Sequence, residues 1–176
     1  MGLGSVVALA NIDVPRMAAN SILEWMNVTA VFEASPHVVC EVGPLHAWFT
    51  EPRGVVVQLM EAAPVTTDMA RWLVGPGFEQ LLKRFASPTE LTLVLDIRPM
   101  TERDRAVRTL LMDHAREHVW RFADVVVIPP LQINAVYLTT LHAAAALLGA
   151  FGAKVRIESS VPQALQKCQL AGVSAQ

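Results

Sequence analysis

The most constraining feature of this chain is the alternation of short β-branched runs with long helical patterns between Leu91 and Lys167. Three runs predict strands, and three further segments predict helices. In chain order they are LTLVLDI, ERDRAVRTLLMDHAREHVWRF, DVVVI, INAVYLTTLHAAAALLGAFG, KVRIES and VPQALQK. Strands that alternate with helices run parallel, because each helix carries the chain back across the sheet. The pattern predicts an α/β fold with parallel strands in its C-terminal half and helices packed on them.

The part of the chain before Leu91 predicts a smaller β-rich region. Its strand-like segments are Val38–Val42, Ala47–Thr50 and Gly54–Glu61. The tetrapeptide Glu51-Pro52-Arg53-Gly54 is typical of a hairpin turn, because proline presets φ and glycine accepts a positive φ. A hairpin joined to parallel strands predicts a mixed sheet.

A helical region is expected at Thr66–Phe85. Its second half carries a stripe of apolar residues at i, i+3, i+4 and i+7, which predicts a core-facing side. These residues are Phe78, Leu81, Leu82 and Phe85. The tripeptide Gly75-Pro76-Gly77 predicts a kink or two short helices, since proline removes a helical donor. It does not match a GxGxxG nucleotide loop, because Gln80 stands where the last glycine is needed.

The domain boundaries follow from these elements. Residues 1–35 form an N-terminal extension, with a helix expected at Met17–Phe32 that packs on the domain or on another subunit. Residues 36–170 form a single α/β domain, which is an ordinary size for one hydrophobic core. Residues 171–176 form a tail.

Composition narrows the classes of partner. Hydrophobic residues make up 53% of the chain and charged residues 17%, so apolar surface remains for an interface or a ligand. The net charge of -2 gives no footprint for nucleic acid. The two cysteines, Cys40 and Cys168, show no metal-binding or disulfide spacing, and we expect a reducing cytoplasm.

The stretch from Val125 to Ala153 carries no formal charge and tests whether the chain spans a membrane. Pro129-Pro130 divides it, and the second part contains Asn134, Thr139, Thr140 and His142. These polar groups argue against a membrane span. We expect instead a helix covered by the sheet on one side and by a partner on the other, with Ala143–Ala146 and Gly149 allowing close approach.

The sharpest catalytic motif is His114-Ala115-Arg116-Glu117-His118, which matches the H-x-x-E-H pattern of inverted zinc hydrolases. Residues four apart share one helix face, so both imidazoles could bind one ion with Glu117 as the general base. The same face carries Val107 and Leu111, however, and the only third ligand in view is an unmotivated Glu158. We predict no metal or other cofactor, and expect both rings at the margin of the helix–sheet contact with a polar partner each.

A group of charged residues follows the run at 91–97. Asp96 and Asp104 could be paired carboxylates, but Arg98, Arg103 and Arg105 are close enough in sequence to neutralise them. We expect a solvated charge cluster that serves as a partner surface at the carboxyl ends of the strands.

Thr101 is a possible phosphosite within this group. Thr-x-x-Asp before a helical pattern is more typical of an N-cap that satisfies free backbone amides. The two roles are compatible, because a phosphate is also favourable at a helix N-terminus.

The order of elements resembles the STAS domain of anti-sigma-factor antagonists, and it is closer to divergent STAS/SEC14-like bacterial proteins. The resemblance covers roughly residues 36–170. The stretches that carry it are LTLVLDIRPMTERDRAVRTL, ADVVVIPP and KVRIESSVPQAL.

In that family the loop after the central strand carries Asp-Ser-Ser/Thr-Gly, whose phosphorylated serine switches partner binding. Here Asp96-Ile97-Arg98-Pro99-Met100-Thr101 stands in its place and the Ser-Gly is absent. The resemblance therefore implies a partner surface at Asp96, Arg98, Thr101, Arg103 and Asp104, without the usual switch.

These observations lead to a non-enzymatic regulatory or scaffolding domain that binds a protein partner, a second copy of itself, or both. Leftover apolar surface tends to mark such an interface. Two alternatives stay open. The first is a pocket for a small apolar ligand or lipid beneath the helices, and the second is zinc-dependent hydrolysis at His114 and His118.

Overall fold

The computed structural model describes residue 32 and residues 34–85, 90–103, 105–130, 135–150, 152 and 154–171. The helix expected at Met17–Phe32 lies outside the described residues except for Phe32, which is not helical. The side chain of Phe32 is buried against Trp48, with ring centroids 5.4 Å apart.

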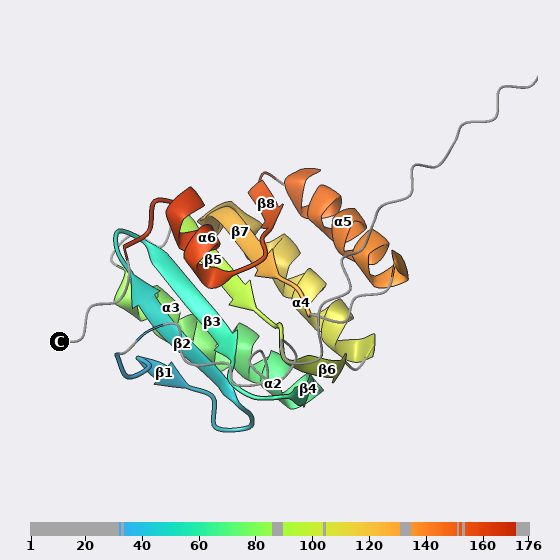
Figure 1. Ribbon diagram of the computed structural model, residues 1–176, viewed down its shortest axis with the longest axis horizontal. Coiled ribbons are helices and arrows are strands. Elements are labelled where there is room, and N and C mark those ends of the chain that lie inside the picture. Colours follow the sequence, from blue (N-terminus) through green and yellow to red (C-terminus); the bar gives the residue numbers. More distant parts are fainter. Residues whose placement is uncertain are drawn as a thin grey trace, which may run out of the picture.

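A six-stranded sheet forms the centre of the molecule (Figure 1). Its strands, in spatial order, are β1 (Val38–Val39), β2 (Leu45–Thr50), β3 (Gly54–Leu59), β5 (Leu91–Asp96), β7 (Phe122–Ile128) and β8 (Lys154–Ile157). The first three pair antiparallel and the last four pair parallel. The prediction that the runs near positions 91, 125 and 154 lie side by side is confirmed.

The hairpin turn is also where the sequence places it. Thr50 at the end of β2 pairs with Gly54 at the start of β3, so residues 51–53 form the connection. Gly54 is needed here, because a Cβ at this position would overlap the Thr50 hydroxyl and lie 2.7 Å from a methyl of Leu170.

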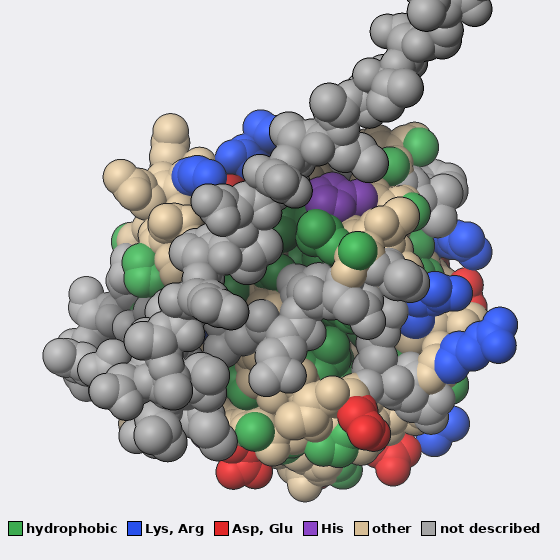
Figure 2. Space-filling model, turned by 45° about the vertical axis from the view of Figure 1, so that its right-hand side comes forward, with side chains coloured by type: hydrophobic (Ala, Val, Ile, Leu, Met, Phe, Trp, Pro, Cys, Tyr) green, Lys and Arg blue, Asp and Glu red, His purple; other side chains and the backbone are tan. Residues whose placement is uncertain are grey.

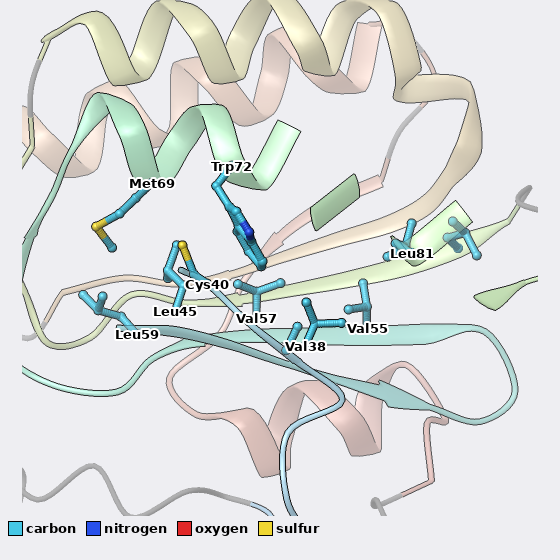
Figure 3. Packing of buried hydrophobic residues seen from close by; sticks show 11 residues of the cluster. Val38, Cys40, Leu45, Val55, Val57, Leu59, Met69, Trp72 and Leu81 are labelled. Carbon is cyan, nitrogen blue, oxygen red and sulfur yellow. The ribbon is translucent and has the colours of Figure 1, made fainter. Parts of the chain in front are cut away.

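One face of the sheet packs against α2 (Thr67–Trp72) and α3 (Phe78–Arg84). Thr66 caps α2 by accepting a hydrogen bond from the amide of Met69. Figure 3 shows Met69 and Trp72 pointing from α2 toward the strands, where they meet valines and leucines of β2 and β3. A π-helical turn at Leu73–Gly77 joins the two helices, as the Gly-Pro-Gly break predicts.

The opposite face packs against α6 (Val161–Lys167), which lies in front of the sheet in Figure 1. Ser160 caps this helix by accepting a hydrogen bond from the amide of Gln163, and Pro162 stands in its first turn. The row Trp48–Val56–Val94–Val126 runs across four neighbouring strands on this face, and each of these side chains is fully buried. This row is the core beneath α6.

The remaining elements lie around the parallel strands. They are β4 (Ala63–Val65), β6 (Met100–Arg103), α4 (Arg105–His118), a 3₁₀ turn at Val119–Arg121 and α5 (Ala135–Ala150). Strands β4 and β6 pair parallel as a separate two-stranded ribbon. Helix α4 contacts α2, and α5 contacts β8 (Figure 1).

Candidate functional site

Asp96 and Arg98 form a buried ion pair at the carboxyl end of β5. Nε and Nη2 of Arg98 donate to the two carboxylate oxygens at 2.8 and 2.7 Å, and its backbone amide donates at 3.3 Å. The Asp96 side chain is fully buried and that of Arg98 is 13% exposed. The hydrogen bond to Asp96 raises the pKa of Arg98 above its usual value. The expectation of a solvated charge cluster is therefore wrong for these two residues, which pair with each other and stabilise the end of the strand.

Thr101 is not the cap of a helix. It lies within β6, which pairs with β4, and α4 begins only at Arg105. The capping expectation is wrong because strand pairing holds this segment extended, a contact with residues far away in sequence. Thr101 and the neighbouring Glu102 are exposed.

The two other residues expected at this surface are only partly placed. Arg103 ends β6 and pairs with Val65 of β4. Asp104 lies outside the described residues, and so does the pairing of its carboxylate with that of Asp96 considered from the sequence. Among the described side chains of the five residues expected to form the partner surface, that of Thr101 is exposed.

A row of three polar side chains crosses the sheet at the buried ion pair, and the sequence pattern does not predict it. His46, Gln58 and Asp96 are register partners on β2, β3 and β5, and they lie on the α6 face next to the buried valine row. Gln58 is fully buried, and within the described part of the chain neither its Nε2 nor its Oε1 has a hydrogen-bond partner. In the run VVVQLM a glutamine looks like a residue that alternates toward solvent, which explains why pattern reasoning misses it.

His114 and His118 share one face of α4, as their spacing predicts. Their ring centroids are 4.4 Å apart, and both rings contact Phe78 of α3, at 4.6 and 4.9 Å. The expected polar partners are replaced by aromatic packing, although Glu117 Oε1 lies 3.9 Å from His118 Nε2. Among the described residues no three His, Cys, Asp or Glu side chains are grouped to hold a metal ion. Glu158, the third ligand considered, instead accepts both of its short contacts from Lys167.

An open cavity of about 420 Å³ lies near the turn between β2 and β3. It is lined by Pro52, Arg53, Glu90, Thr92, Cys168 and Leu170. Arg53 and Glu90 form an ion pair at 3.3 Å across it. Polar and apolar groups share this lining about equally, and the cavity is open to solvent, whereas an apolar ligand or lipid is held in a pocket of predominantly hydrophobic side chains.

Helix α5 presents an unusually apolar surface. It has no charged residue, and none of its described side chains is buried. The exposed positions follow one helical face: Ala135, Leu138, Thr139, His142, Ala143, Ala146, Gly149 and Ala150. The Thr139 hydroxyl donates to the carbonyl of Ala135, and His142 Nδ1 contacts the carbonyl of Leu138, so these polar groups bond within the helix. Figure 2 turns this side of the molecule forward and shows apolar side chains gathered near a histidine, with charged groups toward the rim.

No protein-family model matches the sequence, and no curated protein does. Among solved structures, the chain is similar to an uncharacterized protein of the DUF3478 family from Shewanella loihica PV-4, described as having a SpoIIAA-like fold. The TM-score is 0.51 at 13% identity, over 70% of this chain and 91% of that one. This chain has a SpoIIAA-like fold. The resemblance to STAS domains is therefore confirmed, and at this identity it is a likeness of fold alone.

The membrane question has a direct answer within the described residues. None of their helices combines the length and the apolar character that a bilayer crossing needs. Helix α5, the most apolar of them, has 16 residues, fewer than the roughly 20 that span a hydrocarbon core.

Proposed function

We propose that this protein is a non-enzymatic, STAS-like interaction domain that assembles with a second copy of itself through the exposed face of α5. The observation that carries the proposal is a helix of 16 residues without a single charge and without a buried side chain among those described. Burial of apolar surface is the main favourable term in protein association. A contact between copies supplies that burial for α5.

The chemistry of this face suits a second copy. In a two-fold dimer the same patch meets itself, so a charged patch would oppose like charges. Helix α5 has no charge to oppose, and its polar groups at Thr139 and His142 already bond to its own carbonyls. A 16-residue helix is about 24 Å long. Its alanines and Gly149 permit close approach of two backbones along that length.

A second, smaller surface fits a regulatory partner. Thr101 and Glu102 are exposed on β6, and Arg105 and Arg108 are exposed at the start of α4. This is the region where the STAS resemblance implies partner binding. Because Asp96 and Arg98 are buried against each other, the contact residues offered to a partner are Thr101, Glu102, Arg105 and Arg108.

The proposal keeps the cytoplasmic location that we expect from the cysteines. Cys40 and Cys168 are free thiols, the state favoured in a reducing compartment.

A pair of matched substitutions tests the role of α5. Leu138 is 39% exposed on α5, and Val42 is 52% exposed in the turn between β1 and β2. Both changes, Leu138→Lys and Val42→Lys, replace an exposed aliphatic side chain by a lysine. We expect Leu138→Lys to abolish self-association in sedimentation velocity, while Val42→Lys leaves it unchanged. If both variants behave as the parent chain does, α5 is not the interface.

A further inference from the structure

Two histidines and a phenylalanine join α4 to α3. The rings of His114 and His118 lie 4.4 Å apart on α4, and Phe78 of α3 contacts both of them. The ring of Phe78 stands edge-on to that of His114, with an interplanar angle of 90°. Phe122 of β7 extends the cluster, with its ring centroid 6.2 Å from that of Phe78. These contacts place two titratable groups in the middle of an otherwise apolar junction.

The elements around the pair bring little charge to compensate a second proton. Those packed against it present Phe78 and Phe122, while the charged residues of α3, Glu79, Lys83 and Arg84, are exposed. On α2, Asp68 and Arg71 bond to each other, as Asp113 and Arg116 do on α4. Arg121, just after α4, is a further positive group, and its guanidinium stacks on Trp120 at 4.1 Å. A carboxylate beside the pair is that of Glu117, whose Oε1 lies 3.9 Å from Nε2 of His118.

A positive charge on the His114 ring is unfavourable in this setting. Two positive rings in contact repel each other, and both would lose water against Phe78. Burial, and next the charge of His118, lower the pKa of His114, while the charge of Glu117, the smallest of the three effects, raises it. The geometry and the charges therefore agree that the packed junction favours the neutral form of His114.

We propose that His114, packed between Phe78 and His118, forms an acid-sensitive latch between α3 and α4, which loosens when the His114 imidazole takes up a proton. The latch lies on the opposite side of the sheet from α6. It holds α4, the helix that begins at Arg105 just after β6. Its opening would free α4 from α3 while the parallel sheet stays intact. The inference does not depend on self-association through α5.

The direction of the pH effect follows from linkage. Because the pKa of His114 is lower in the folded chain than in the unfolded one, the unfolded chain binds more protons as the medium becomes acidic. The junction is fully stable above the ordinary histidine pKa of about 6.5. Stability is lost as the pH falls through that value and continues to fall until the folded pKa is reached.

The test compares the whole chain with His114→Gln and His118→Gln, and uses His37→Gln as the control. Glutamine keeps a polar side chain but cannot take up a proton, and His37 is an exposed histidine before β1, outside α3, α4 and α5. Denaturant unfolding is measured at about pH 7.5 and about pH 5.5, on either side of the ordinary histidine pKa. Amide hydrogen exchange, corrected for the intrinsic pH dependence, reports which helices open first.

We expect the unfolding equilibrium constant of the parent chain and of His37→Gln to rise more on acidification than that of His114→Gln, because both keep the ring at position 114 whose pKa is lower in the folded chain. Exchange should rise first in α3 and α4, while β5 and β7 stay protected. The same pH dependence in all four proteins would overturn the latch, as would exchange that rises uniformly. If His114→Gln does not fold, His118→Gln decides the question: it removes a cause of the lowered pKa of His114, so its stability should depend less on pH than that of the parent chain, and an unchanged dependence would overturn the latch.

Discussion

Arg98 binds both carboxylate oxygens of Asp96 at the carboxyl end of β5, and the aspartate is completely buried. A charge in that position is stable only because it is paired and hydrogen-bonded. The pair thus fixes the exit of the central strand.

Loss of this pair should destabilise the chain strongly. Asp96→Ala leaves the guanidinium of Arg98 nearly buried and unpaired, which costs about 3 kcal/mol or more. The matched control is Asp113→Ala, because the Asp113–Arg116 pair is exposed on both sides and such pairs contribute about 0.5 kcal/mol or less. Urea unfolding of the two variants checks the difference, and equal losses would show that the Asp96 pair is not effectively buried.

Glycine at position 54 should not be replaceable. Gly54→Ala forces a methyl group into Thr50 and Leu170, and we expect a loss of about 1–3 kcal/mol from overpacking. Gly75→Ala is the control, because nothing lies within 4 Å of a Cβ there and the position is helical. It should gain about 0.5–1 kcal/mol by restricting the unfolded chain. Thermal unfolding measures both, and a tolerated Gly54→Ala would contradict the close approach of Leu170 to the hairpin.

The cap of α6 offers a comparison between adjacent serines. Ser160→Ala removes the acceptor of the Gln163 amide and should cost about 1 kcal/mol. Ser159→Ala removes an exposed hydrogen bond to the Gln163 side chain and should cost less than about 0.5 kcal/mol. Denaturant midpoints of the two variants distinguish these costs. A larger effect at Ser159 would mean that the helix begins elsewhere.

Both thiols should be sluggish toward alkylating reagents. Burial raises the pKa of Cys40 and of Cys168, and the charge of Asp124 raises that of Cys168 further. A raised pKa leaves less thiolate, the reactive form, at neutral pH. Iodoacetamide should therefore label the native chain more slowly than the chain in guanidinium chloride, with the rate rising toward alkaline pH. Equal rates at Cys168 in the two states would show that α6 does not shield it.

The sequence predicts the parallel half of the sheet well, because its β-branched runs are long and are separated by clear helical patterns. The hairpin at Glu51–Gly54 and the cap at Ser160 are equally local, since each is set by residues within one turn. Such features need no knowledge of distant contacts.

The parts that escape prediction depend on the tertiary structure. Strands β4 and β6 are short and partly exposed, and they form only because they meet each other, which moves Thr101 from a helix cap into a strand. The burial of Asp96 follows from neighbouring strands and from Arg98 folding back, which a charge pattern does not reveal. Gln58 is buried for the same reason.

The mass of the whole chain in solution, measured by light scattering over a range of concentrations, tests the interaction role most directly. One copy weighs 19.2 kDa. Assembly through α5 predicts a particle of at least twice that mass, which returns to a single copy in Leu138→Lys. A mass that stays at one copy for the parent chain at every concentration would contradict the account.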